Sequence, residues 1–229
     1  MSGEPCFDIA HLAHVELLTD KPAESLDFFV NVYGLTESGR EGDSVFLRAW
    51  DDYEFHTLKL TAAKTTGIGH VAYRATSAQA LQRRVEAIEA MGCGIGWVDG
   101  DLGHGRAYRF RDPDDHVFEI YFDTNKYAAP PHERPALKNQ PQRNHGRGCA
   151  VRRLDHLNLL ARDVAAIRDF LPKALGSRVT EQIVLDSGEV GGCWFTVNNK
   201  SYDIAYTRDH TGSLGRFHHV TYAVDQREH

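Results

Sequence analysis

The stretch "HVELLTDKPAESLDFFVNVYGL" at residues 14–35 recurs in similar form as "HLNLLARDVAAIRDFLPKALGS" at residues 156–177. Aligned without gaps, the two share His, Leu, Leu, Ala, Asp, Phe and Gly at matching places. Each copy has the pattern of a strand, a turn and an amphipathic helix that ends at a glycine, Gly34 or Gly176. An internal duplication therefore organises the chain.

A second, fainter pair repeats as "GHVAYRA" at residues 69–75 and "HHVTYAV" at residues 218–224. The first of these precedes "TSAQALQRRVEAIEAMG", a helix that we expect to be capped by Thr76 or Ser77 and to end at Gly92. The order of these segments predicts three β-α-β-β-β modules followed by the first strand of a fourth.

This plan predicts an α+β fold in which the repeated modules form two partly closed mixed sheets, with the fourth module incomplete. We expect an N-terminal two-module domain at residues 1–125, a connector at 126–150 with four prolines and no periodicity, and a C-terminal domain at 151–229. Pro22 suits the start of the first helix, whereas Pro172 is expected to bend or shorten the third.

Composition limits the function classes. The 229 residues carry a formal net charge of −6 and are 41% hydrophobic, as in an ordinary globular protein without a nucleic-acid surface. No apolar stretch is long enough to span a membrane and no signal peptide is present, so we expect a cytoplasmic protein. The scattered thiols of Cys6, Cys93, Cys149 and Cys193 are expected to be free.

Strand alternation separates the histidines, because successive side chains of a strand point to opposite faces. In the strand that opens the third module, Leu157 and Leu159 suit the face under the helix. His156 and Asn158 then face the concave side. In the last strand the same rule sends His219 to the concave side and His218 the opposite way.

His14 and His70 occupy the matching places of the N-terminal half, so each half directs two imidazoles into its own sheet. Two converging imidazoles are a start for a metal site. In "DPDDHVFEIYF", Glu119 lies 49 residues after His70 and can complete a set of two histidines and one carboxylate. A glutamate in so apolar a strand is costly unless it is paired or bound to metal. The stretch "EFHTLKL" offers no further ligand that the pattern can place.

Applied to His219, the same spacing gives position 268, whereas the sequence has 229 residues. We therefore expect the C-terminal set to hold His156 and His219 without its carboxylate, and the fourth module to be truncated.

Together, "LDHLNLL", "NKSYDIAY", "GRFHHVTY" and "DPDDHVFEIYF" resemble the type I extradiol ring-cleavage dioxygenases, the catechol 2,3-dioxygenase group of the vicinal oxygen chelate superfamily. The resemblance covers nearly the whole chain. It implies Fe(II) bound by His156 and His219, with a later glutamate as third ligand. It also implies that the N-terminal set is a vestigial copy.

The implied reaction is extradiol cleavage of a catechol by O₂, in aromatic catabolism, to a product of the 2-hydroxymuconic-semialdehyde type. The full-length protein is expected to be a homo-oligomer with a small catechol as substrate and with no nucleic-acid or membrane partner. The 229-residue chain alone is expected to be inactive or feeble, because its site lacks one ligand.

One position departs from the family pattern. The family commonly has an acid–base histidine beside the aspartate of "NKSYD", where this chain has Tyr202 before Asp203. A phenol, with an ordinary pKa of about 10, is a poorer base than imidazole. Tyr202 could be a tuned base, a hydrogen-bond donor to bound oxygen or a space filler, and His210 could assist it. Asn158 is expected to be a polar neighbour of the metal or simply an inward polar residue.

Two other functions stay open. In the first, the N-terminal set of His14, His70 and Glu119 is itself a functional site for a metal or a small ligand. In the second, the chain sequesters a ligand without iron chemistry, as bleomycin-resistance proteins of the same superfamily do. The long connector and the four-module plan disfavour the second.

Overall fold

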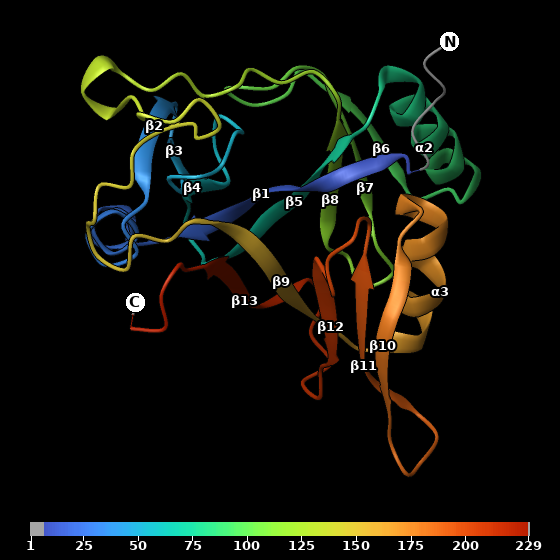
Figure 1. Cartoon of the computed structure of the whole chain (residues 1–229). Coiled ribbons are helices and arrows are strands. Elements are labelled where there is room, and N and C mark those ends of the chain that lie inside the picture. Colours follow the sequence, from blue (N-terminus) through green and yellow to red (C-terminus); the bar gives the residue numbers. More distant parts are fainter. Residues whose placement is uncertain (1–6, 229) are drawn as a thin grey trace.

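A computed structural model describes residues 7–228, and Figure 1 shows two mixed sheets, neither closed. Eight strands form the N-terminal sheet in the order β2-β3-β4-β1-β5-β8-β7-β6, and five form the other in the order β10-β11-β12-β9-β13. The first eight strands are β1 (Ile9–Thr19), β2 (Thr36–Glu41), β3 (Ser44–Arg48), β4 (Leu58–Ala62), β5 (Gly67–Ala75), β6 (Gly94–Val98), β7 (Ala107–Arg111) and β8 (Val117–Tyr121). The remaining strands are β9 (Arg153–Ala161), β10 (Arg178–Val184), β11 (Val190–Thr196), β12 (Ile204–Arg208) and β13 (Arg216–Ala223).

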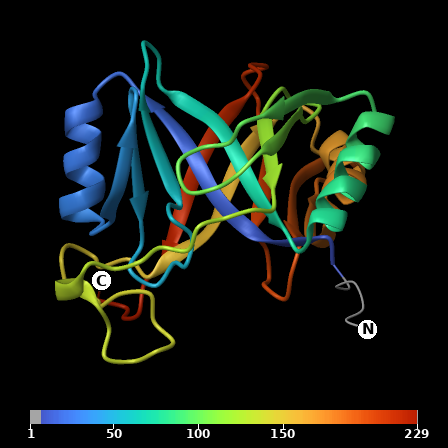
Figure 2. The same cartoon turned by 90° about the horizontal axis from the view of Figure 1, so that it is seen from above.

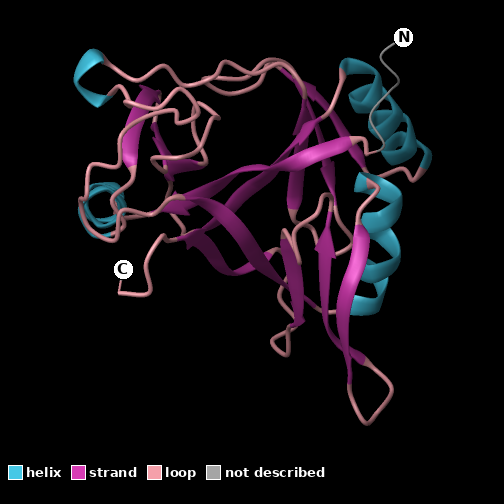
Figure 3. Ribbon diagram, in the orientation of Figure 1, coloured by secondary structure: helices cyan, strands magenta, loops and turns pink. Residues whose placement is uncertain are grey.

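The helices follow the opening strands of three modules, as Figure 3 shows in cyan. Helix α1 (Pro22–Asp27) continues as a π-helical turn (Phe28–Val32), and helices α2 (Ala78–Ala90) and α3 (Val164–Leu175) follow β5 and β9. The α+β class and the module order are therefore confirmed.

The duplication is visible in the strand pairing. In the N-terminal sheet β1 pairs antiparallel with β5, and these two strands pair parallel with β4 and β8. In the C-terminal sheet β9 pairs antiparallel with β13 and parallel with β12. The first strands of consecutive modules therefore lie side by side at the centre of each pair of modules.

The apolar faces lie where alternation predicts them. Val71 and Tyr73 in β5 and Leu157 and Leu159 in β9 are fully buried in one hydrophobic core. Helices α2 and α3 pack against each other beside this core, which joins the two halves (Figure 2). Burial of the apolar side chains of this core supplies most of the driving force for folding.

Of the two effects expected of Pro172, a bend or a shorter helix, shortening does not occur. Helix α3 contains Pro172 and continues to Leu175, where Gly176 in the left-handed conformation ends it. A proline inside a helix removes one backbone hydrogen bond. Here only one turn follows Pro172, and the fully buried Leu171 and nearly fully buried Leu175 hold that turn against the sheet.

The polar stretch expected to be a connector has no regular structure beyond a 3-10 turn at Pro131–Glu133 and crosses the N-terminal sheet. Its buried Gln142 accepts a hydrogen bond from the guanidinium of Arg48, a large and fully buried side chain. The thiols of Cys93, Cys149 and Cys193 are free, and Cys6 lies outside the described residues. None of the helices within residues 7–228 has the length and apolar character needed to cross a membrane.

The end of this stretch fits tightly against the first helical segment at Gly148. Its φ is +56°, and an added Cβ would lie 2.2 Å from the carbonyl oxygen of Val32. Gly146 has a similar φ of +63° but open space around it. Substitutions at these two glycines therefore distinguish the cost of a left-handed backbone, which both share, from the cost of steric overlap, which occurs only at Gly148.

We expect Gly146→Ala to lower the free energy of unfolding by about 1 kcal/mol, the cost of a left-handed alanine. Gly148→Ala should cost at least about twice as much, because the backbone must also move. Urea unfolding of both variants measures the difference. Equal losses would contradict the close approach at Gly148.

Candidate metal centres

The C-terminal pair of histidines lies on two adjacent strands, β9 and the edge strand β13. His156 in β9 and His219 in β13 have ring centroids 5.5 Å apart and nearly perpendicular planes. The Nδ1–H of His156 donates a hydrogen bond of 2.7 Å to Asp155, which leaves Nε2 with its lone pair. This hydrogen bond holds the pKa of Asp155 below its usual range, despite partial burial. A carboxylate behind an imidazole is the usual support of a histidine that binds metal.

His218 does not point opposite to His219, contrary to expectation. The two Nδ1 atoms lie 2.7 Å apart, within hydrogen-bonding distance. The reason is an irregular register between Phe217 and His219, because a bulge breaks the strict alternation of a strand. His218 is exposed and His219 half-buried, and partial burial together with the neighbouring imidazoles lowers the pKa of His219.

Tyr202 and Asn158 both lie close to this pair. The ring of Tyr202 meets the ring of His156 edge-on, with centroids 4.6 Å apart. Asn158 stands opposite His219 in the strand register and donates a hydrogen bond of 3.0 Å to the hydroxyl of Thr207. Its carbonyl oxygen is buried and has no donor among the described residues.

The segment before Tyr202 is held against the beginning of β9 by polar contacts. Lys200 donates to the backbone carbonyl of Asp155 and forms an ion pair with its carboxylate at 3.5 Å. Asp203 is buried and accepts hydrogen bonds from Thr196 and from the backbone of Val197. These contacts fix the loop on which Tyr202 approaches His156. His210 is exposed.

Among residues 7–228 no third donor converges with the C-terminal pair. Within residues 7–228, two groups of three or more histidine, cysteine or carboxylate donors converge, and both lie in the N-terminal half. One is the expected set of His14, His70 and Glu119. The other combines His14 with His56, Asp101 and His104.

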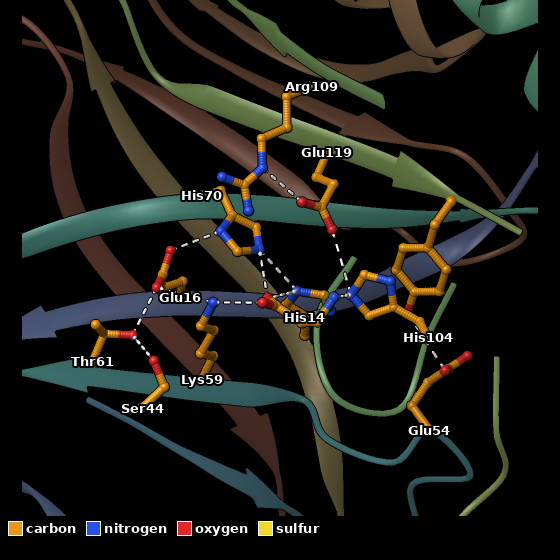
Figure 4. Close-up of polar contacts among 12 residues, drawn as sticks. His14, Glu16, Ser44, Glu54, Lys59, Thr61, His70, His104, Arg109 and Glu119 are labelled. Carbon is orange, nitrogen blue, oxygen red and sulfur yellow. Dashed lines mark hydrogen bonds and ion pairs between the residues drawn. The ribbon is translucent and has the colours of Figure 1, made fainter. Parts of the chain in front are cut away.

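The N-terminal pair repeats the geometry of the C-terminal pair. The ring centroids of His14 and His70 are 5.0 Å apart and nearly perpendicular, and their Nε2 atoms are 2.9 Å apart. His14 stands opposite Ala72 in the register, two residues after His70, just as His156 stands opposite Thr221, two residues after His219. Glu119 lies opposite Ala72 on the next strand. The three side chains converge in Figure 4.

Polar neighbours orient this set. The Nδ1–H of His70 donates a hydrogen bond of 2.8 Å to Glu16, and Arg109 donates one of 2.8 Å to Glu119 (Figure 4). Burial raises the pKa of Glu16, but the hydrogen bond and charge of His70 outweigh it and lower that pKa to about 2. The contact engages Nδ1 of His70 and leaves its Nε2 as the atom that faces His14.

His56, Asp101 and His104 escaped the sequence analysis. His56 belongs to "EFHTLKL", the stretch that seemed to offer no ligand, and its ring lies 4.3 Å from that of His14. It precedes β4, the parallel neighbour of β1, which could have indicated this proximity. Asp101 and His104 lie on a loop without periodicity, so no pattern could have placed them.

The buried histidines are poor bases. Burial, together with the neighbouring imidazoles, lowers the pKa of His14 well below its usual value and that of His56 to about 3. Burial likewise lowers the pKa of His104, despite the nearby Glu119. Neutral imidazoles have lone pairs for a metal ion near neutral pH.

The chain was compared with known families and proteins. The model of the Glyoxalase/Bleomycin resistance protein/Dioxygenase superfamily matches residues 11–120. The chain is 44% identical to a metapyrocatechase of Geobacillus stearothermophilus, over 96% of this chain and 67% of that protein. It is 36% identical to a manganese-dependent 2,3-dihydroxybiphenyl 1,2-dioxygenase of Geobacillus genomosp. 3, over 95% of this chain and 70% of that protein.

Solved structures agree with this fold. The 2,3-dioxygenase LapB from Pseudomonas sp. KL28 superposes with a TM-score of 0.86 at 22% identity, over 98% of this chain and 78% of that one. The homoprotocatechuate 2,3-dioxygenase of Arthrobacter globiformis gives 0.82 at 26% identity, over 97% of this chain and 66% of that one. The chain therefore spans 66% to 78% of the length of these relatives.

The low pKa of His56 predicts acid sensitivity of the metal-free protein. The unfolded chain takes up a proton on His56 near pH 6.5, whereas the folded chain does so only near pH 3. The free energy of unfolding is therefore unaffected by this residue above pH 6.5 and falls as the pH drops toward 3, by up to about 5 kcal/mol.

We expect His56→Gln to make the loss of stability between pH 6.5 and pH 4 shallower in urea unfolding with a chelator present. His132→Gln, at a side chain that is 78% exposed, should leave the pH dependence unchanged. Parallel curves for the parent protein and His56→Gln would contradict the prediction.

Proposed function

The chain belongs to the extradiol ring-cleavage dioxygenases of the Glyoxalase/Bleomycin resistance protein/Dioxygenase superfamily, and from this membership we propose that it provides the metal-binding histidines for catechol cleavage by O₂. The observation that carries the proposal is the pair of His156 and His219 on the adjacent strands β9 and β13. The identity of 44% to a metapyrocatechase supports a catechol as substrate.

The two histidines suit a divalent metal. Because Nδ1 of His156 donates a hydrogen bond to Asp155, the Nε2 lone pair of His156 is available for a metal ion. His219 lies beside His156 and has a lowered pKa. Fe(II) fits a set of two histidines and one carboxylate with open positions. One relative is named manganese-dependent, so Mn(II) is the second ion to test. When bound, such an ion supplies a positive charge that favours the deprotonated diol and a template for both reactants.

The protein residues around the pair have separate roles. Asp155, held by Lys200, fixes the ring of His156 in one tautomer and orientation. Tyr202, whose ring touches His156, donates a hydrogen bond from its hydroxyl group to the substrate oxygens. Asn158 has a buried carbonyl oxygen that lacks a donor among the described residues and can accept a hydrogen bond from substrate or water. These groups orient the diol.

The proposed product is a 2-hydroxymuconic-semialdehyde type of compound, which is yellow. For the 229 residues alone we propose little activity, because the described residues give His156 and His219 no third ligand. A robust yellow product from these residues with Fe(II), 3-methylcatechol and O₂ would contradict this part of the proposal.

The pair of adjacent histidines offers a matched test in the longest available polypeptide that contains this chain. We expect His219→Ala to lower ring cleavage of 3-methylcatechol more than about 100-fold, since a metal ligand is lost. His218→Ala removes an exposed neighbour and should cost at most a few-fold. Comparable losses in the two variants, or activity without either histidine, would overturn the assignment.

Tyr202 allows a test of hydrogen bonding against acid–base catalysis in the same polypeptide. We expect Tyr202→Phe to lower kcat about 10-fold, the effect of one lost hydrogen bond. A loss beyond about 100-fold, with a changed pH profile of kcat/KM, would instead make the phenol the base.

A further inference from the structure

The N-terminal half holds a second complete set of metal ligands that the proposed catechol site does not use. His14, His70 and Glu119 come from the adjacent strands β1, β5 and β8, and each is fully buried. Their donor atoms all lie within 4.8 Å of one another. Two nitrogen ligands held at about 2.1 Å from one ion at a right angle lie about 3 Å apart. The observed 2.9 Å between the Nε2 atoms matches this spacing.

Unsatisfied carboxylate oxygens face the same space. Glu119 Oε1 and Asp101 Oδ2 are buried and have no hydrogen-bond donor among the described residues. Asp101 Oδ2 lies 3.8 Å from Nε2 of His70, and Glu119 Oε1 lies 3.4 Å from Nε2 of His104. A buried carboxylate oxygen without a donor is costly, and a cation between these groups would remove that cost.

The charges around the set also favour a cation. Three carboxylates, those of Glu16, Asp101 and Glu119, face two protein cations, Lys59 and Arg109. Counted without the histidines, these side chains therefore carry an excess of negative charge in a largely buried region. The two protein cations bind the outer carboxylate oxygens, Asp101 Oδ1 and Glu119 Oε2, and leave the inner oxygens open.

The surroundings make this a closed centre. His56 and His104 are also buried, with exposed fractions of 3% and 9%, and their rings lie 4.3 and 5.3 Å from that of His14. Tyr121 stacks on His104 with centroids 4.0 Å apart. These side chains fill the space in which an exchangeable substrate would have to bind.

We propose that His14, His70 and Glu119 bind a divalent transition-metal ion in an enclosed centre that stabilises the N-terminal sheet and contacts no substrate. Two imidazoles and a carboxylate suit Zn²⁺, Fe²⁺ or Co²⁺ better than Mg²⁺ or Ca²⁺, which prefer oxygen ligands. Glu16 behind His70 and Arg109 behind Glu119 orient the ligands.

The experiment uses the full chain with His156→Ala and His219→Ala, so that metal held by the C-terminal pair is not counted. This background protein is freed of metal and then loaded with Zn(II) or Co(II). We expect one ion per chain by elemental analysis after desalting, and a melting temperature several degrees higher than that of the metal-free form. No retained metal and no change in melting temperature would overturn the proposal.

Further variants in this background identify the ligands. Glu119→Gln keeps the size of the side chain and should lower the affinity for Zn(II) at least about 10-fold. His70→Ala should do the same, whereas His132→Ala, at an exposed histidine, should have no effect. Loss of metal in His56→Ala together with full retention in Glu119→Gln would assign the ion to the other group and overturn this ligand set.

A spectrum needs no variant of the buried set and therefore does not depend on its folding. At the right-angle spacing of the two Nε2 atoms, Co(II) bound by the three protein ligands and two or three water molecules should give the weak absorption of a five- or six-coordinate ion. The intense visible bands of tetrahedral Co(II) would instead show the closed set of His14, His56, Asp101 and His104, and would overturn the assignment. Ring cleavage is not measured, so failure of the catechol proposal would not affect the result.

Discussion

The antiparallel pairing of the first strands of consecutive modules is the constraint on which both metal sets depend. It brings β1 beside β5 and β9 beside β13. In each pair of strands, the histidine of the first strand stands opposite the residue two positions after the histidine of the second. The two imidazoles therefore meet edge-on at the concave surface. A shift of one residue would move one imidazole of each pair to the helix-covered face, where it would replace an apolar side chain. Burial of Leu157 and Val71 on that face therefore also fixes the histidines on the other.

This frame explains how much could be predicted from the sequence. The duplication and the alternation of apolar residues are sufficient to place His14, His70 and Glu119 together, because these residues lie on well-buried strands whose pairing brings their donor atoms together despite register shifts beside His14. The same rule failed at His218, where a bulge changes the direction of the side chain. Pro172 does not shorten its helix, because tertiary packing holds the last helical turn against a local preference.

Loop residues of the candidate sites had no pattern to reveal them. Asp101 and His104 reach the N-terminal histidines from the segment between β6 and β7, and Lys200 reaches Asp155 from the turn before β12. Their positions follow from how the chain closes over the sheet, which depends on many weak contacts and not on a period. The sequence pattern therefore indicates the ligands on the strands but not Asp101, His104 or Lys200 around them.

The closure of the N-terminal centre depends on two glycines in that same loop. Gly100 and Gly103 have φ angles of +90° and +100°, which side chains rarely adopt. An added Cβ at Gly100 would lie 2.1 Å from the carbonyl oxygen of Gly105, and one at Gly103 would lie 2.3 Å from Cβ of Phe55. Any side chain at these positions would push the loop outward, and with it Asp101 and His104. In the C-terminal pair, His219 is only half-buried, and the ring of Tyr202 lies beside His156. The C-terminal pair is therefore more accessible than the N-terminal pair. Two copies of one strand frame thus carry similar imidazole pairs in different surroundings, and the loops decide which of them a substrate can reach.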